Sequence, residues 1–182
     1  MNDTPEFSPS LSVTRGAPSA ELAKAADIAA EECLALKAGE TLLIITNPDT
    51  EQETIARALE KAGQAKGCAV RLLLQPVKSQ VDFAEEYVLD AIEAVPDAVV
   101  SLSADKLGKD GKRLSRPLRS PGGKSYDHIF TYLLSGTGKI RSFWSPGVSI
   151  ECFARTLTAD YGLMRRRAGR LARILEIGRA HV

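Results

Sequence analysis

The chain has 182 residues, of which 44% are hydrophobic and 26% are charged, and its formal net charge is +1. A chain of this length can bury enough surface for one stable core without disulfides. The near-neutral charge argues against a protein that binds nucleic acid through its overall charge. No apolar run approaches the roughly 20 residues that cross a bilayer, so we do not expect a membrane protein.

The cysteines and the amino-terminal residues predict a cytoplasmic protein. Cys33, Cys68 and Cys152 form an odd set without a C-x-x-C pair, which fits neither a disulfide framework nor a zinc ribbon. We expect all three to be small core residues. Residues 1–18 are polar and lack the basic start and apolar middle of a signal peptide. We interpret them as a flexible segment that precedes the folded domain.

Helical and strand-like patterns alternate from Ser19 to Leu102. Thr50 and Glu53 have the spacing of a capping box, so we interpret the preceding loop at Asn47 as an ordinary capped turn. The short apolar runs are typical of strands that are buried on both faces. Helices are expected over 19–37, 50–67 and 81–95, and strands over 41–46, 69–74 and 98–102. This alternation predicts an α/β fold, a three-layer Rossmann-like domain with a mostly parallel sheet and helices on both faces.

The regular alternation stops after Leu102. Residues 105–124 combine lysine and arginine with glycine and proline, and we interpret them as a long basic loop. Beyond this loop we expect a helix over 126–134, a strand over 139–144, a helix from the Ser149 cap to 156, and a last helix capped by Asp160. In the last helix an apolar stripe is expected to be buried, and the arginines are expected to form the solvent-exposed face. The stripe consists of Tyr161, Met164, Ala168, Leu171 and Leu175.

The common catalytic and phosphate-binding motifs are missing. The segment from Gly136 to Lys139 is no Walker A loop, because Leu133 stands where the first glycine is needed. No G-x-G-x-x-G follows the first strand, and no G-x-S-x-G elbow occurs. His128 and His181 are the only histidines, so the chain cannot supply a three-histidine metal site. We interpret His128 as a structural residue.

The most distinctive segment is Arg141-Ser-Phe-Trp-Ser-Pro-Gly147, which contains the only tryptophan. Together with Ala104–Lys109, Tyr126–Phe130 and residues 160–167, it resembles the N-terminal domain of the aminopeptidase T (leucyl aminopeptidase) family of metallopeptidases. The resemblance runs from about Ala20 to Leu175. The segment around Trp144 is its most specific part, whereas the α/β alternation before it is generic.

The resemblance implies the N-terminal portion of a metal-dependent aminopeptidase that hydrolyses N-terminal residues from peptides. Members of the family hold two divalent metal ions in a C-terminal domain, so no catalytic residue and no metal ligand carries over to this chain. By itself this portion is expected to be inactive and to hold no cofactor. We expect Arg141, Trp144 and Arg155 at the boundary with that domain or on the wall of its cleft. The expected partners are a peptide substrate and a second copy of the full-length chain, without nucleic acid or membrane.

Two alternatives stay open at this point. Relatives of the same fold cleave aromatic rings with a single iron ion, so the parent protein could be an iron-dependent ring-cleaving dioxygenase. Two histidines and one carboxylate in the further domain would favour that reading. The other alternative is a non-enzymatic ligand-binding α/β module, which would be favoured if the gene stops where this sequence does.

The carboxyl-terminal residues do not continue the pattern of the last helix. Residues 177–182 read as the translation of a widely used short-read sequencing adapter, so we expect an artefactual tail with few buried contacts. The predicted domain therefore covers 19–176, and the natural protein is expected to continue beyond about Leu175.

Overall fold

The structure, a computed structural model, describes residues 19–179, with the side chains of 19–175. The predicted flexible segment 1–18 lies outside the described residues, as do residues 180–182 of the predicted tail. The strands are β1 (Thr41–Thr46), β2 (Ala69–Leu74), β3 (Ala98–Leu102), β4 (Leu118–Arg119), β5 (Ser125–Tyr126) and β6 (Arg141–Trp144). The helices are α1 (Ala20–Ile28), α2 (Glu51–Ala65), α3 (Glu86–Glu93), α4 (Gly111–Ser115), α5 (Ile129–Thr131), α6 (Ile150–Leu157) and α7 (Tyr161–Arg179), with π-helical turns η1 (Ala29–Cys33) and η2 (Tyr132–Gly136).

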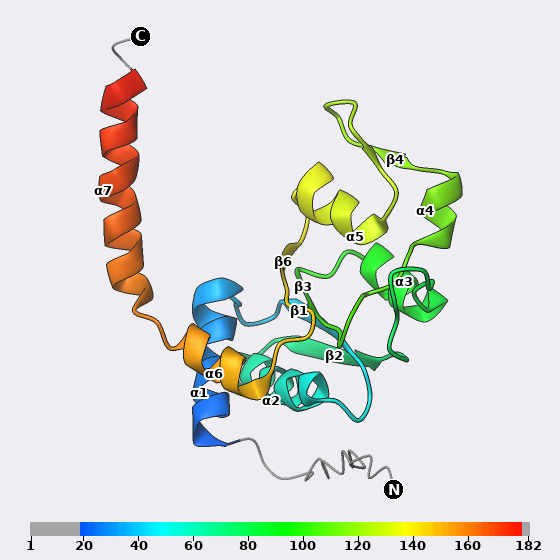
Figure 1. The fold of residues 1–182 in the computed structure, drawn as a ribbon, viewed down its shortest axis with the longest axis horizontal. Coiled ribbons are helices and arrows are strands. Elements are labelled where there is room, and N and C mark those ends of the chain that lie inside the picture. The colour runs from blue at the N-terminus through cyan, green and yellow to red at the C-terminus, as the bar shows by residue number, and fades with distance from the viewer. Residues whose placement is uncertain (1–18, 180–182) are drawn as a thin grey trace, which may run out of the picture.

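Four parallel strands form the central sheet in the order β2-β1-β3-β6 (Figure 1). Ile44 of β1 lies opposite Leu72 of β2 and Val100 of β3, and Val100 pairs on its other side with Phe143 of β6. The strand predicted over 139–144 begins two residues later than expected, and the other three predicted strands have the expected bounds.

Two separate cores lie on the two faces of this sheet. Leu42 and Ile44 of β1 point into the first core, where α1, α2 and α6 cover the sheet. Leu43 and Ile45 point into the second core, beneath α3 and α5. Successive side chains of a strand point to opposite faces, so one short apolar run supplies both cores. Figure 1 shows the helices on both sides of the sheet, and the predicted three-layer α/β fold is confirmed.

Side-chain caps fix the starts of several helices as predicted. The Thr50 hydroxyl accepts a hydrogen bond from the Glu53 amide at 3.2 Å, whereas the Glu53 carboxylate accepts from the Asp49 amide at 2.8 Å. The capping box therefore closes one residue earlier than its standard form. Ser149 accepts from Cys152 N at 3.2 Å and begins α6, and the Asp160 carboxylate caps α7.

The first predicted helix ends earlier than Lys37. The helical backbone changes from α1 to the wider turn η1, and Ala35 then takes a left-handed conformation with φ of 47°. Leu34 and Leu36 flank this residue, and both are buried. A continuing helix would turn the two leucines about 200° apart, so burying both requires the chain to bend between them.

The helix predicted over 81–95 is wrong in its first part, because α3 begins only at Glu86. Val81, in that first part, is 71% exposed. Residues 78–84 instead run beside residues 106–109, and the Ala84 amide donates to a carbonyl of that segment at 3.0 Å. These backbone groups make tertiary hydrogen bonds in place of helical ones.

The basic segment 105–124 is folded rather than a long loop. It contains α4, and β4 pairs antiparallel with β5. Lys112 of α4 lies 3.0 Å from the Asp90 carboxylate, and Arg113 pairs with Glu93. Two of its basic residues thus face the acidic side of α3. The helix predicted over 126–134 is similarly divided into β5, α5 and η2.

Helix α7 projects from the body of the domain (Figure 1). Near its start, the Tyr161 hydroxyl lies 3.4 Å from the Cys33 sulfur, and Arg165 pairs with Glu32. The predicted burial of the apolar stripe is wrong: Met164 and Leu171 are 54% and 58% exposed, and Ala168 and Leu175 are exposed as well. The helix leaves the domain before most of its stripe can reach a core. Its backbone continues to Arg179, so the tail prediction for 177–182 falls largely outside what is described.

Only one of the three cysteines lies in the core. Cys68 is buried, whereas Cys33 and Cys152 are exposed. On α6, Phe153 takes the inward position, which turns the neighbouring Cys152 outward. The prediction of three core cysteines is therefore wrong for two of them.

Candidate functional site

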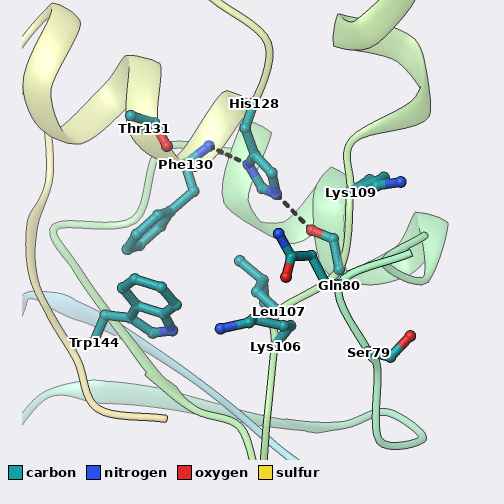
Figure 2. Close-up of a pocket in the computed structure, with 10 residues that line it drawn as sticks. Ser79, Gln80, Lys106, Leu107, Lys109, His128, Phe130, Thr131 and Trp144 are labelled. Atoms are coloured by element: carbon teal, nitrogen blue, oxygen red, sulfur yellow. Dashed lines mark hydrogen bonds between the residues drawn. The ribbon is translucent and has the colours of Figure 1, made fainter. Parts of the chain in front are cut away.

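A pocket of about 250 Å³ opens at the carboxyl edge of the sheet, beyond the ends of β3 and β6 (Figure 2). It is lined by Ser79, Gln80, Lys106, Leu107, Gly108, Lys109, His128, Phe130, Thr131 and Trp144. In open α/β sheets, ligands bind outside the carboxyl ends of the parallel strands. The place of this pocket is therefore that of a ligand site.

The position between β1 and β3, where the strand order reverses, is closed by Asn47. Its side-chain nitrogen donates to the Gln75 carbonyl at 2.9 Å, and its side-chain oxygen accepts from the Ala104 amide at 2.6 Å. The buried amide thus bridges the chain segments that follow β2 and β3. This bridge occupies the crevice in which such folds commonly bind ligands, and the pocket lies one strand further along the sheet.

Apolar side chains form one side of the pocket. Trp144 is the last residue of β6, pairs with Ser101 of β3, and is 53% exposed. Phe130 at the start of α5 and Leu107 after β3 are both buried. Figure 2 shows the Phe130 ring and the Trp144 indole on the same side of the pocket, with Leu107 beside them. An exposed indole beside two buried apolar side chains offers a surface for an aromatic group.

Gly108 allows two chain segments to meet at the pocket. Its φ is +100°, and a Cβ at this position would lie 2.4 Å from the Ala84 nitrogen. Only glycine combines this backbone conformation with such a close approach. The contact holds the segment that carries Ser79 and Gln80 against the loop that carries the two lysines.

His128 is fixed in its neutral form. Its Nδ1 accepts a hydrogen bond from the Phe130 amide at 3.1 Å, so the proton is on Nε2, which donates to the Gly108 carbonyl at 3.2 Å. Burial lowers the pKa of His128, and the charge of Asp110 only partly opposes this shift. With both ring nitrogens bonded, His128 serves as the N-cap of α5, and its structural interpretation is confirmed.

The pocket carries positive charge. Its lining contains two lysines and no aspartate or glutamate. Lys106 lies 3.8 Å from Asp105, which is beyond hydrogen-bond distance. In Figure 2, Lys106 extends toward the Trp144 indole nitrogen, whereas Lys109 points away from the two rings. The pocket is thus suited to an anion that carries an apolar group.

The three residues predicted for the boundary or cleft wall are not brought together. Trp144 lines the pocket, but Arg141 lies at the opposite end of β6 and pairs with Glu40. The Arg141 guanidinium is the main cause that lowers the pKa of Glu40, and the Lys37 amide adds to the effect. Arg155 is on α6, its side chain 77% exposed and 3.9 Å from Glu151.

Several pocket residues were missed by the sequence analysis. Lys106, Leu107 and Lys109 lie in the loop directly after β3, and Phe130 begins α5. Their position in the sequence directly after a predicted buried strand could have indicated a ligand site, because such loops contact ligands in α/β folds. Ser79 and Gln80 carried no such signal, since they reach the pocket only through the tertiary pairing of residues 78–84.

The described residues do not fit a metal centre. Among residues 19–175, no group of three or more histidine, cysteine, aspartate or glutamate side chains could hold a metal ion. The nitrogens of His128 are both engaged. In the same part of the chain, none of the helices has the length and apolar character needed to cross a bilayer.

No protein-family model and no curated protein matches this chain. Among solved structures, it is similar to wild-type AmpT from Thermus thermophilus, with 14% identity over 75% of this chain and 41% of that one, and a TM-score of 0.42. It is also similar to 2,5-dihydroxypyridine dioxygenase from Pseudomonas putida KT2440, with 13% identity over 54% of this chain and 32% of that one, and a TM-score of 0.37. The chain thus spans less than half the length of either protein.

Proposed function

We propose that this chain forms the N-terminal α/β domain of a metal-dependent aminopeptidase and that its pocket forms part of the substrate cleft. One observation carries the proposal. Of the four segments on which the family resemblance rests, three contribute to the lining of this pocket although they are distant in the sequence: Ala104–Lys109, Tyr126–Phe130 and Arg141–Gly147. The fourth, 160–167, does not line it.

In this proposal the chain binds and positions substrate and does not carry out hydrolysis. The described side chains offer no set of metal ligands, so the two divalent metal ions that the resemblance implies are assigned to a further domain. The expected parent is a cytoplasmic homodimer that acts on peptides, without nucleic acid or a membrane as partner.

The test is an aminopeptidase assay on two proteins, the chain of 182 residues and a longer protein in which this chain is joined to the proposed metal-binding domain. The short chain should release nothing from a leucine arylamide, even with added zinc, cobalt or manganese. The long protein should turn over the same substrate, and a chelator should abolish the turnover. Chelator-sensitive turnover by the short chain would refute the proposal, because the active site would then lie in this chain and not in a further domain.

The same preparation separates the alternatives. Iron-dependent oxygen uptake with an aromatic diol, without peptidase activity, would assign the long protein to ring cleavage. A gene that encodes no further domain would favour a ligand-binding module. Under the aminopeptidase proposal, Trp144→Ala in the long protein should raise KM for peptides with little change in kcat, since the residue binds substrate away from the reacting bond.

A further inference from the structure

Two residues of the pocket lining, Lys106 and Trp144, each carry a hydrogen-bond donor. Figure 2 shows the Lys106 ammonium directed toward the Trp144 indole nitrogen. Trp144 is 53% exposed, and the ion pair of Lys106 with Asp105 is loose at 3.8 Å, so both donors are accessible to a ligand. A carboxylate oxygen accepts from both kinds of donor, so the pair is complementary to a carboxylate.

The space beside these donors is apolar and matches the size of one ring. A cavity of about 150 Å³ lined by apolar side chains is large enough for benzene, and this pocket measures about 250 Å³. Phe130, Leu107 and the Trp144 indole line one side of that space. An aromatic side chain and an adjacent carboxylate would fill it together.

The charge of the lining excludes the opposite end of a peptide. An α-ammonium group beside the two rings would meet Lys106 and no carboxylate of the lining, and His128 adds no negative charge because it is neutral. The electrostatic preference is therefore for the carboxyl end of a ligand.

We propose that this pocket binds an aromatic carboxylate, in the form of the carboxyl-terminal aromatic residue of a short peptide. Lys106 and the Trp144 indole N–H hold the carboxylate, and Phe130 packs against the ring. The choice of a peptide as its source rests on the proposed function. The carboxylate chemistry stands on the pocket alone. In an aminopeptidase, such a site would favour short peptides, because the carboxyl end is anchored while the amino end reaches the metals.

Trp144 is the only tryptophan of the chain, so its fluorescence reports directly on the pocket. The probes are N-acetylphenylalanine, its carboxamide and N-acetylalanine, titrated into the 182-residue chain. We expect a saturable change in emission with the first probe, binding weaker by roughly tenfold with the carboxamide, and little response to N-acetylalanine, which lacks the ring.

Variants of Lys106 and Trp144 test whether these two donors hold the carboxylate, as opposed to the positive charge of the chain in general. Lys106→Met should weaken N-acetylphenylalanine binding roughly tenfold and leave carboxamide binding unchanged. The matched control is Lys61→Met, which removes an exposed lysine from α2 outside the pocket, and it should bind like wild type. Trp144→Phe keeps an aromatic ring but loses the N–H, and calorimetry should show weaker binding of N-acetylphenylalanine than in the wild-type chain. Circular dichroism confirms that each variant is folded.

Equal affinity for the acid and the carboxamide would overturn the carboxylate assignment, as would the absence of a saturable response at millimolar concentrations. A comparison with 3-phenylpropionate tests the source of the ligand: tighter binding of N-acetylphenylalanine supports a peptide end, and tighter binding of the free acid overturns it. This binding is measured without turnover. If the aminopeptidase assay fails but N-acetylphenylalanine still binds, only the proposed function is refuted. If N-acetylphenylalanine does not bind, the pocket proposal itself is refuted.

Discussion

The Nε2–H of His128 donates to the carbonyl oxygen of Gly108 across 3.2 Å. This bond joins the loop after β3 to the start of α5, and both segments line the pocket. The other ring nitrogen accepts from the Phe130 amide. Protonation of His128 would place an N–H against that amide N–H, so the neutral ring is required for this arrangement.

Stability should therefore depend on the charge state of His128. Burial lowers its pKa in the folded protein below the ordinary value of 6.5. Between the two pKa values the unfolded chain binds more protons, so the free energy of unfolding decreases as the pH falls. The contribution of His128 is complete above about pH 6.5 and is lost as the pH falls through the folded pKa. Urea unfolding at about pH 7.5 and pH 5 should show a smaller pH-dependent loss for His128→Gln than for wild type.

His181→Asn is the matched control, since His181 is the only other histidine. That variant should keep the pH dependence of the wild-type protein. If His128→Gln and wild type lose the same free energy over this range, the neutral buried state of His128 is refuted.

Gly108→Ala should destabilise the domain more than an alanine at an ordinary left-handed glycine. The Cβ would meet the Ala84 nitrogen at 2.4 Å, in addition to the left-handed backbone cost of about 1–2 kcal/mol. Gly123 has a φ of +82° with nothing within 4 Å of its Cβ position, so Gly123→Ala should cost only the backbone part. Equal losses for the two variants in urea unfolding would show that the Gly108 contact is not tight in solution.

The layers of the fold were predictable because they depend on local composition. The runs at 41–46 and 98–102 are apolar at nearly every position, as strands covered on both faces require. Helix starts were predictable for a similar reason, since Thr50 and Ser149 satisfy amides only a few residues away. These signals lie within one short window of sequence.

The site and two helical regions depend on contacts between distant segments. Val81 follows helical spacing, but residues 78–84 pair with 106–109 and bring Ser79 to the pocket. Nothing in either segment alone encodes that pairing. The stripe of α7 has the spacing of a buried face, yet spacing cannot say what, if anything, covers it. Trp144 could be singled out because it is the only tryptophan and ends a predicted strand, whereas Lys106 is one of many basic residues in the segment 105–124.

Asn47→Ala should cost about 2–4 kcal/mol of stability. The substitution removes two hydrogen bonds and leaves the buried Gln75 carbonyl and the half-buried Ala104 amide without their partner, and each unsatisfied buried group costs about 1–3 kcal/mol. Asn47→Asp should lose only one of the two hydrogen bonds, since a carboxylate accepts from the Ala104 amide but cannot donate to the Gln75 carbonyl. A loss below about 1 kcal/mol for Asn47→Ala would mean that water replaces the bridge.

Removal of α7 beyond Leu163 should leave the stability of the domain nearly unchanged. The deleted side chains of Met164, Leu171 and Leu175 are mostly exposed, so their removal uncovers no core, and the melting temperature should stay within about 2 °C of wild type. Phe153→Ala is the contrasting variant, because Phe153 is 3% exposed and its loss should cost about 3–5 kcal/mol. The truncated chain should also bind less of a hydrophobic dye, since the exposed stripe is gone. A drop of many degrees on truncation would show instead that α7 folds back in solution and buries its stripe against the domain.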